Sequence, residues 1–71
     1  MWSYDSSAGK LYIVPLPDGT YGIKFDGIIW EACPTPQAQA DNVFARATGC
    51  PAIDDLQQVP TDLSGWVYSN L

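Results

Sequence analysis

Alternating large apolar and small or polar residues mark the first half of the chain and predict β-strands. The clearest case is residues 21–26, in which Tyr21, Ile23 and Phe25 fall at every second position. A period of two places these three side chains on one face of a strand, so we expect that face to be buried. Residues 10–16 predict a second strand because they are rich in β-branched and aromatic side chains.

Turn-forming residues separate the predicted strands. Residues 17–20 combine proline, aspartate and glycine, which is typical of a turn. Asp26 and Gly27 predict a tight hairpin. Residues 2–4 predict a first strand, which a loop joins to the second. Pro15 has no backbone donor, so we expect it at a strand end or on an edge.

The next strand is predicted at residues 28–33. Its large apolar residues are consecutive, so two registers are open: one buries Ile28 and Trp30, and the other buries Ile29. Near the end of the chain, residues 64–69 contain Trp, Val and Tyr and predict a last strand.

The strongest helical signal lies between these strands. Thr35 is a favourable N-cap, and Pro36 occupies the first helical position, where a missing amide costs nothing. The apolar positions recur at i, i+3, i+4 and i+7, namely Ala40, Val43, Phe44 and Ala47. The polar positions on the opposite face are Gln37, Asp41 and Thr48. We expect Phe44 to be the main buried anchor, Gly49 to end the helix, and Pro51 to prevent its continuation.

The order of these elements defines the predicted fold class. Residues 51–58 favour one or two short helical turns, with Ile53 and Leu56 in contact with the core. We therefore expect an α+β protein with a small antiparallel sheet of about four to five strands packed on one α-helix, in the order β-β-β-α-short helical turn-β. At 71 residues the chain is expected to form a single domain, residues 1–71.

Charge then narrows the classes of function. Eight acidic residues stand against three basic ones, Lys10, Lys24 and Arg46, which gives a net charge of −5, and the sequence has no histidine. A phosphate backbone or an anionic membrane surface would repel such a chain, so we expect no direct nucleic-acid binding and no membrane binding. The sequence also lacks an apolar run near the roughly 20 residues that span a bilayer.

Residues suited to catalysis are few. Without histidine, the usual Ser–His–Asp and Cys–His mechanisms lack their general base. A carboxylate with a raised pKa is the remaining option. Its candidates are Asp26, Glu31, Asp54 and Asp55. However, turn chemistry explains Asp18 and Asp26 beside their glycines and Asp5 at the start of a loop, and a solvated helical turn explains Asp54 and Asp55. We therefore predict that the protein is not an enzyme.

The sequence also lacks the ligands of a metal site and the cysteine spacing of a disulfide. Zinc prefers four Cys or His ligands, and the chain has two cysteines. The spacing of its acidic residues does not fit a calcium loop. The ends of the predicted helix are about 20 Å apart, whereas a disulfide needs Cα atoms about 4.4–6.8 Å apart. The short loops that join Cys33 and Cys50 to these ends cannot close most of that gap. We expect two free thiols, a reducing compartment, and no metal or cofactor.

The remaining candidates are surfaces. One is acidic and lies in the C-terminal half, at Asp41, Asp54, Asp55 and Asp62. The other is aromatic, because Trp and Tyr are favoured as interface anchors. Core packing is the alternative for each of its candidates, which are Trp2, Tyr4, Tyr12, Trp66 and Tyr68, and we assign Trp66 and Tyr68 to the surface. An acidic face of this kind either keeps a protein soluble or meets a Lys/Arg-rich partner through steering and ion pairing.

Size, acidity and the lack of catalytic residues resemble, in class alone, those of small inhibitors carried by phages and mobile elements, such as anti-CRISPR proteins and DNA mimics. The resemblance implies a cytoplasmic, non-enzymatic protein that occludes a basic surface of a larger protein, for instance its nucleic-acid site. The alternative is a structural or assembly module, such as a homodimer joined through a sheet edge or an aromatic face.

Overall fold

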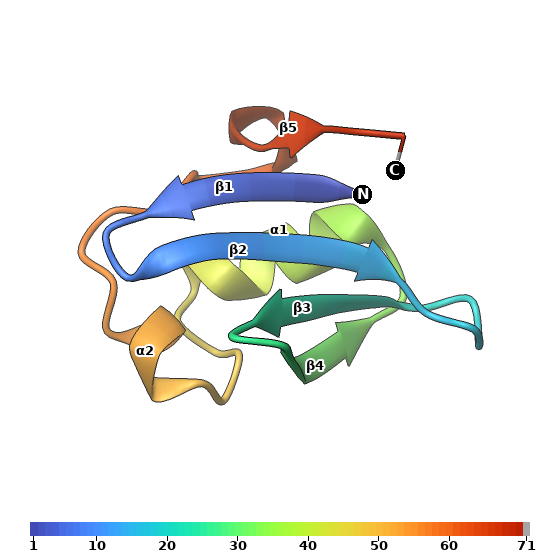
Figure 1. Ribbon diagram of the computed structural model, residues 1–71, viewed down its shortest axis with the longest axis horizontal. Coiled ribbons are helices and arrows are strands. Elements are labelled where there is room, and N and C mark those ends of the chain that lie inside the picture. The colour runs from blue at the N-terminus through green and yellow to red at the C-terminus, as the bar shows by residue number, and fades with distance from the viewer. Residues whose placement is uncertain (71) are drawn as a thin grey trace.

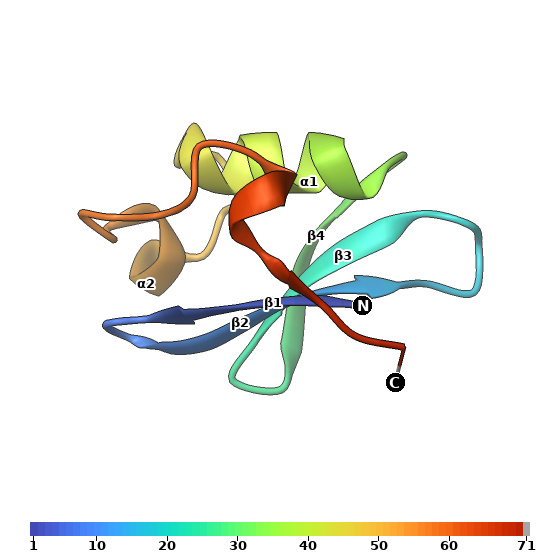
Figure 2. The same ribbon diagram turned by 90° about the horizontal axis from the view of Figure 1, so that it is seen from above.

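A computed structural model of the protein describes residues 1–70. At its centre is a five-stranded antiparallel sheet in the order β4-β3-β2-β1-β5 (Figure 1). The strands are β1 (Trp2–Ser6), β2 (Gly9–Pro15), β3 (Tyr21–Phe25), β4 (Ile28–Cys33) and β5 (Val67–Tyr68). The helices lie on one face of the sheet, as Figure 2 shows. The predicted α+β fold class is therefore confirmed.

The hairpin turns follow from their residues. Asp26 and Gly27 both have positive φ, 54° and 77°, as a tight turn between antiparallel strands requires. In the β2–β3 turn, the Asp18 carboxylate accepts hydrogen bonds from the Thr20 amide (3.0 Å) and the Thr20 hydroxyl (2.6 Å). The predicted turn roles of Asp18 and Asp26 are thus confirmed, and Pro15 is the last residue of β2, as expected.

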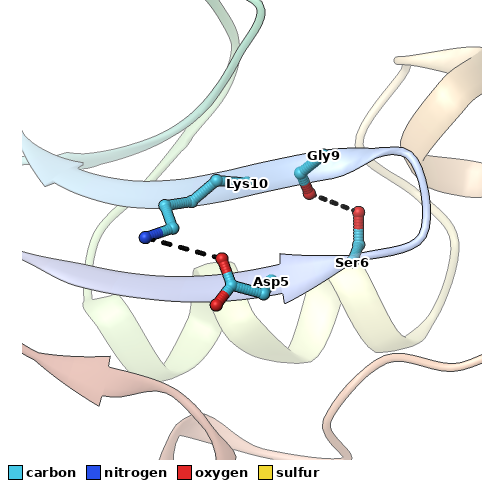
Figure 3. Close-up of polar contacts among 4 residues, drawn as sticks. All are labelled: Asp5, Ser6, Gly9 and Lys10. Atoms are coloured by element: carbon cyan, nitrogen blue, oxygen red, sulfur yellow. Dashed lines mark hydrogen bonds and ion pairs between the residues drawn. The ribbon is translucent and has the colours of Figure 1, made fainter.

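Asp5 lies within β1, so the prediction that it begins a loop is wrong. It faces Lys10 of β2 across the ladder, and Lys10 Nζ lies 3.5 Å from Asp5 Oδ1 (Figure 3). The turn comes after Ser6, whose hydroxyl donates a hydrogen bond to the Gly9 carbonyl (Figure 3). These cross-strand contacts extend β1 beyond the predicted residues 2–4.

The core lies between the sheet and the helices. Leu11 and Ile13 of β2 and Ile23 of β3 are fully buried, each 0% exposed. Tyr21 and Phe25 share the face of Ile23 and pack against this core, as the alternation in the sequence predicts. None of the described helices covers the other face of the sheet (Figure 2).

Helix α1 (Pro36–Phe44) begins where the sequence predicts. The Thr35 hydroxyl caps its start by accepting a hydrogen bond from the Ala38 amide at 3.0 Å. The helix ends earlier than expected, because a C-cap forms before Thr48.

This early C-cap is a Schellman motif. The Arg46 amide donates to the Val43 carbonyl, and the Ala47 amide donates to the Asn42 carbonyl, which is the hydrogen-bond pattern of that motif. Arg46 therefore takes the left-handed position after the helix, with φ 60°. The prediction that Gly49 ends the helix is therefore wrong. Arg46 takes the left-handed position instead, although that conformation usually favours glycine.

The buried face of α1 also differs from the predicted one. Val43 is fully buried as expected, but Gln39 is buried too, whereas Phe44 is 49% exposed. Phe44 is therefore not the buried anchor. It is the last residue of the helix and lines a surface hollow of about 490 Å³. Ala47 and Thr48 follow the helix, so the helical period no longer sets their burial: Ala47 is exposed and Thr48 is buried.

Two short elements complete the helical layer, helix α2 (Pro51–Asp54) and the 3-10 turn η1 (Leu63–Gly65). Ile53 (1% exposed) and Leu56 (5% exposed) reach the core, as predicted. The 3-10 turn replaces the first part of the strand predicted at residues 64–69, so β5 has only two residues. No helix that the structure describes is long and apolar enough to cross a membrane.

Strand β4 departs most from the predicted burial. Ile28, Ile29 and Trp30 are 50%, 41% and 37% exposed, so neither predicted register is correct. A β-bulge accounts for part of the difference: Ile29 pairs with Lys24, the next paired residue is Glu31, and Trp30 is left as the extra residue. Helix α1 is held to the strand at Glu31, beyond the bulge, and leaves the first three residues of β4 uncovered.

Candidate functional site

One glutamine brings two of the predicted acidic residues together. Gln37 of α1 donates a hydrogen bond from Nε2 to Asp41 Oδ1 (2.6 Å), one helical turn away. Its Oε1 accepts a hydrogen bond from the amide of Leu63 (3.4 Å), the residue directly after Asp62. Gln37 therefore ties the Asp41 carboxylate to the start of η1, so Asp41 and Asp62 lie on neighbouring parts of the same surface.

Asp62 is held in place by its own turn. It is the N-cap of η1, and its Oδ1 accepts hydrogen bonds from the Ser64 amide (2.9 Å) and the Ser64 hydroxyl. The side chain remains exposed. The cap thus presents the negative charge of Asp62 to solvent in a fixed position.

Asp54 has a structural role. Its Oδ1 accepts hydrogen bonds from the Thr48 amide (3.1 Å) and hydroxyl (2.7 Å), and its Oδ2 accepts one from the Gly49 amide (3.2 Å). These contacts tie α2 to the turn after α1, so Asp54 is not the freely solvated residue that we predicted. Asp55 is the C-cap of α2 and is exposed.

The two predicted aromatic contact residues are in different environments. Trp66 is only 6% exposed, and its ring centroid lies 5.8 Å from that of Tyr4, so it belongs to the core and not to a binding surface. Tyr68 is 59% exposed. Its ring centroid lies 5.0 Å from that of Trp2, its partner in the β1–β5 ladder. Because Trp2 packs against the core, Tyr68 lies on the helix side of the sheet.

The lysines lie on the other face of the sheet. Lys24 alternates with the buried Ile23, and Lys10 alternates with the buried Leu11, so both point away from the helices. Among residues 1–70 the structure contains one ion pair, between Lys10 and Asp5.

The helix side is acidic by contrast. From Asp41 onward the sequence has four aspartates and a single cation, Arg46. Asp41, Asp55 and Asp62 are exposed there, and none of them forms an ion pair within the described residues. We refer to these three residues as the acidic helix-side surface.

A polar cluster between β4 and α1 was not found from the sequence. Glu31 Oε1 accepts a hydrogen bond from Gln39 Nε2 (2.8 Å), and Asn42 Nδ2 lies 3.2 Å from each Glu31 oxygen. The Cys33 thiol lies 3.8 Å from Glu31 Oε1 and 3.4 Å from Asn42 Nδ2. The one signal in the sequence is the i, i+2 spacing of Glu31 and Cys33, which places them on one face of a strand.

The chemistry of this cluster does not suit a nucleophilic thiol. Burial raises the pKa of Cys33, and the neighbouring negative charge of Glu31 raises it further. A reactive cysteine needs the opposite shift, because the thiolate is the nucleophile. The role of Glu31 is structural: it accepts hydrogen bonds from Gln39 and Asn42, which join α1 to β4. Cys33 and Cys50 are both buried, as separate free thiols.

The described residues do not meet the requirements of a metal site. Within residues 1–70, no group of three or more His, Cys, Asp or Glu side chains is placed to hold a metal ion. On the acidic helix-side surface, hydrogen bonds orient the carboxylates of Asp41 and Asp62. Compared with known proteins, the chain matches no family model, no curated protein and no solved structure.

Proposed function

We propose that the protein is a small, non-enzymatic binding protein that occludes a basic surface of a larger protein through its acidic helix-side surface. The observation that carries this proposal is the placement of Asp41 and Asp62. Both are exposed and lie on adjoining parts of the helical layer, linked through Gln37. Neither forms an ion pair within the described residues.

Physical chemistry supports this role in three ways. A surface of one sign attracts a partner of the opposite sign and raises the rate of association. Because the Gln37 and Ser64 hydrogen bonds already orient these carboxylates, binding loses less side-chain entropy than it would with mobile acids. Exposed Tyr68, on the same side of the sheet, adds aromatic contact area.

The proposed partner is a larger protein with a Lys/Arg-rich surface, such as a nucleic-acid-binding site, and the proposed compartment is the cytoplasm. The acidic composition favours such a target over nucleic acid itself, because phosphates would repel the chain. The raised pKa of the Cys33 thiol favours a binding role over thiol catalysis. The class of small phage inhibitors provides the model for this kind of activity.

Affinity capture from a host lysate, followed by elution with increasing salt, tests the proposal. We expect a basic protein that elutes as ionic strength rises, because screening weakens exposed charge contacts. The double variant Asp41→Asn/Asp62→Asn should lose this protein, and asparagine keeps the N-cap of η1. Absence of any salt-eluted basic protein would overturn the proposal.

A matched control separates the surface from net charge. The variant Asp5→Asn/Asp26→Asn removes the same two charges elsewhere, and asparagine tolerates the positive φ of Asp26. We expect this control to retain the partner. Equal loss from both double variants would mean that net charge drives capture and that the acidic helix-side surface is not the site.

A further inference from the structure

The first half of β4 is an exposed apolar edge. β4 is the outermost strand on its side of the sheet, with β3 as its one neighbour. Three consecutive large apolar residues, Ile28, Ile29 and Trp30, are each more than one third exposed there. We refer to these three residues as the β4 edge. An edge strand offers unpaired backbone donors and acceptors, so an apolar one is a ready site for another strand.

The opposite edge of the sheet is different. β5 has two residues, and its short length limits the pairing that it can offer. Natural proteins also protect edges with lysine or proline. β4 has a bulge at Trp30, which protects it in part, but it has neither lysine nor proline within Ile28–Cys33 and its six residues offer more pairing than the two of β5.

The polar side-chain groups of Trp30 and Glu31 in β4 already form hydrogen bonds within the chain. Trp30 Nε1 donates a hydrogen bond to the Phe25 carbonyl of its own hairpin (3.2 Å). Both oxygens of Glu31 are bonded to Asn42 of α1, and one also to Gln39. The β4 edge therefore presents carbon surface and backbone groups, with no side-chain charge that needs a cationic partner.

We propose that the β4 edge pairs with the same edge of a second copy of this chain, antiparallel and about a two-fold axis. The absence of an unengaged charge is the reason for choosing a second copy. Two chains of net charge −5 repel each other, and this repulsion is smallest where the surfaces in contact carry no unengaged charge. A basic partner gains nothing from this edge, whereas the acidic helix-side surface would attract it.

The apolar half of the strand sets the register. An axis at Ile29 places Ile29 opposite Ile29 of the second copy and Ile28 opposite Trp30 of the second copy. Asp26, in the hairpin turn before β4, then falls at the level of Ala32 of the second copy. The two Asp26 carboxylates are thus at opposite ends of the interface and do not face each other.

The predicted dimer is weak. The edge spans one strand, about 20 Å long at the usual rise per residue. A standard stable interface buries about 800 Å² on each partner, which is more than three partly exposed side chains supply. The bulge at Trp30 also limits regular pairing. We therefore expect an association that dissociates on dilution, independent of the proposed acidic contact.

Analytical ultracentrifugation over a wide range of protein concentration tests the inference. We expect a monomer–dimer equilibrium that high salt leaves intact or strengthens, since like-charge repulsion is screened. The variant Ile28→Lys should weaken the dimer about tenfold or more, because lysine blocks edge pairing. The control Val67→Lys, at an exposed position on β5, should dimerise as the wild type does. A chain that stays monomeric at all concentrations, or an equal effect of both lysines, would overturn the inference.

A cross-linking measurement tests the register and does not depend on the stability of the lysine variant. In Ile29→Cys, the two introduced thiols would lie opposite each other at a separation that suits a disulfide. We expect oxidation to give a covalent dimer in this variant and not in the wild type, whose Cys33 and Cys50 are buried. If a Val67→Cys variant cross-linked equally well, the cross-links would come from random collisions, and the proposed register would be wrong. Failure of these tests leaves partner capture by the acidic helix-side surface unaffected, so the two proposals fail separately.

Discussion

The Asp54 carboxylate accepts hydrogen bonds from both the amide and the hydroxyl of Thr48, at 3.1 and 2.7 Å. A third bond, from Gly49, engages the other carboxylate oxygen. These three hydrogen bonds join the turn after α1 to α2. Asp54, which the sequence suggests is a surface acid, therefore has a structural role. Thr48 is buried, so its amide has no easy replacement partner in solvent.

We therefore expect Asp54→Ala to lower the free energy of unfolding by about 1–3 kcal/mol, because it leaves the buried Thr48 groups unsatisfied. Urea denaturation followed by tryptophan fluorescence measures the change. The neighbouring Asp55→Ala is the control, and as an exposed substitution it should stay within about 0.5 kcal/mol of the wild type. Equal effects of the two substitutions would contradict the structural role of Asp54.

Arg46→Gly should stabilise the protein. Arg46 has φ 60° at the end of α1, where a residue with a side chain costs about 1–2 kcal/mol. Glycine removes that cost but gains about 0.5–1 kcal/mol of entropy in the unfolded chain, so a net gain of about 0.5 kcal/mol is expected. Ala45→Gly, at a helical φ of −75°, should destabilise instead. A loss of stability in Arg46→Gly would mean that the arginine side chain makes a contact that outweighs the backbone cost.

The start and end of α1 show which parts of the fold the sequence predicts well. Strands at residues 10–16, 21–26 and 28–33 are set by local period and by turn residues, and the structure places strands there within a residue or two. The helix start is likewise local, because Thr35 and Pro36 suffice to define it. The helix end is not, since Arg46 takes the left-handed position that the sequence assigns to Gly49, and the later residue Asp54 binds Thr48 and Gly49 beyond the cap.

The candidate surface was harder to predict for the same reason. Asp41, Asp54 and Asp62 look alike in the sequence, yet one is linked to Gln37, one binds the turn after α1, and one caps η1. For Trp66 the sequence leaves both a surface role and core packing open, because nothing in residues 64–69 reveals that it packs beside Tyr4 of β1. Such contacts join residues far apart in the chain, and periodicity carries no information about them.

The Cys33 thiol should react slowly in the folded protein. Burial and the charge of Glu31 raise its pKa above the ordinary value of 9.0, so little thiolate forms near neutral pH. Titration with a thiol reagent should find little reaction in the native state and two thiols after denaturation. With Cys50→Ala to isolate the signal, Glu31→Gln should speed the reaction at a fixed pH, because one cause of the raised pKa is removed. A fast native reaction, or fewer than two thiols when unfolded without reductant, would contradict this.

The Asp18 carboxyl should titrate below its ordinary pKa of 3.8. Hydrogen bonds from the Thr20 hydroxyl, and then from the Thr20 amide, favour its charged form and lower its pKa. A carboxylate with a lowered folded pKa stabilises the protein above its unfolded pKa, and this stabilisation is lost as pH falls through the folded value. Carbon-detected NMR titration should therefore place the Asp18 midpoint below 3.8. In Thr20→Val the midpoint should rise, and an unchanged midpoint would remove the hydroxyl as the cause.

Gly22→Ala should destabilise the protein by crowding Ile29. A Cβ at Gly22 would lie 2.8 Å from Ile29 Cγ2 and 3.2 Å from both the Glu31 carbonyl and a Leu16 methyl. Overpacking of this kind costs about 1–3 kcal/mol, measurable by urea denaturation at a concentration where the chain is monomeric.

A double-mutant cycle identifies the residue responsible. Ile29→Ala should recover part of the loss in the Gly22→Ala background, since it removes the closest contact and leaves the Glu31 carbonyl in place. Gly19→Ala is the control, because a Cβ there meets nothing within 4 Å and its cost comes from a φ of 87° alone. Ile29→Ala should not rescue that variant. If it rescued both glycine variants equally, the packing of Ile29 over Gly22 would not be the cause, and the partial burial of Ile29 at the β4 edge would need another explanation.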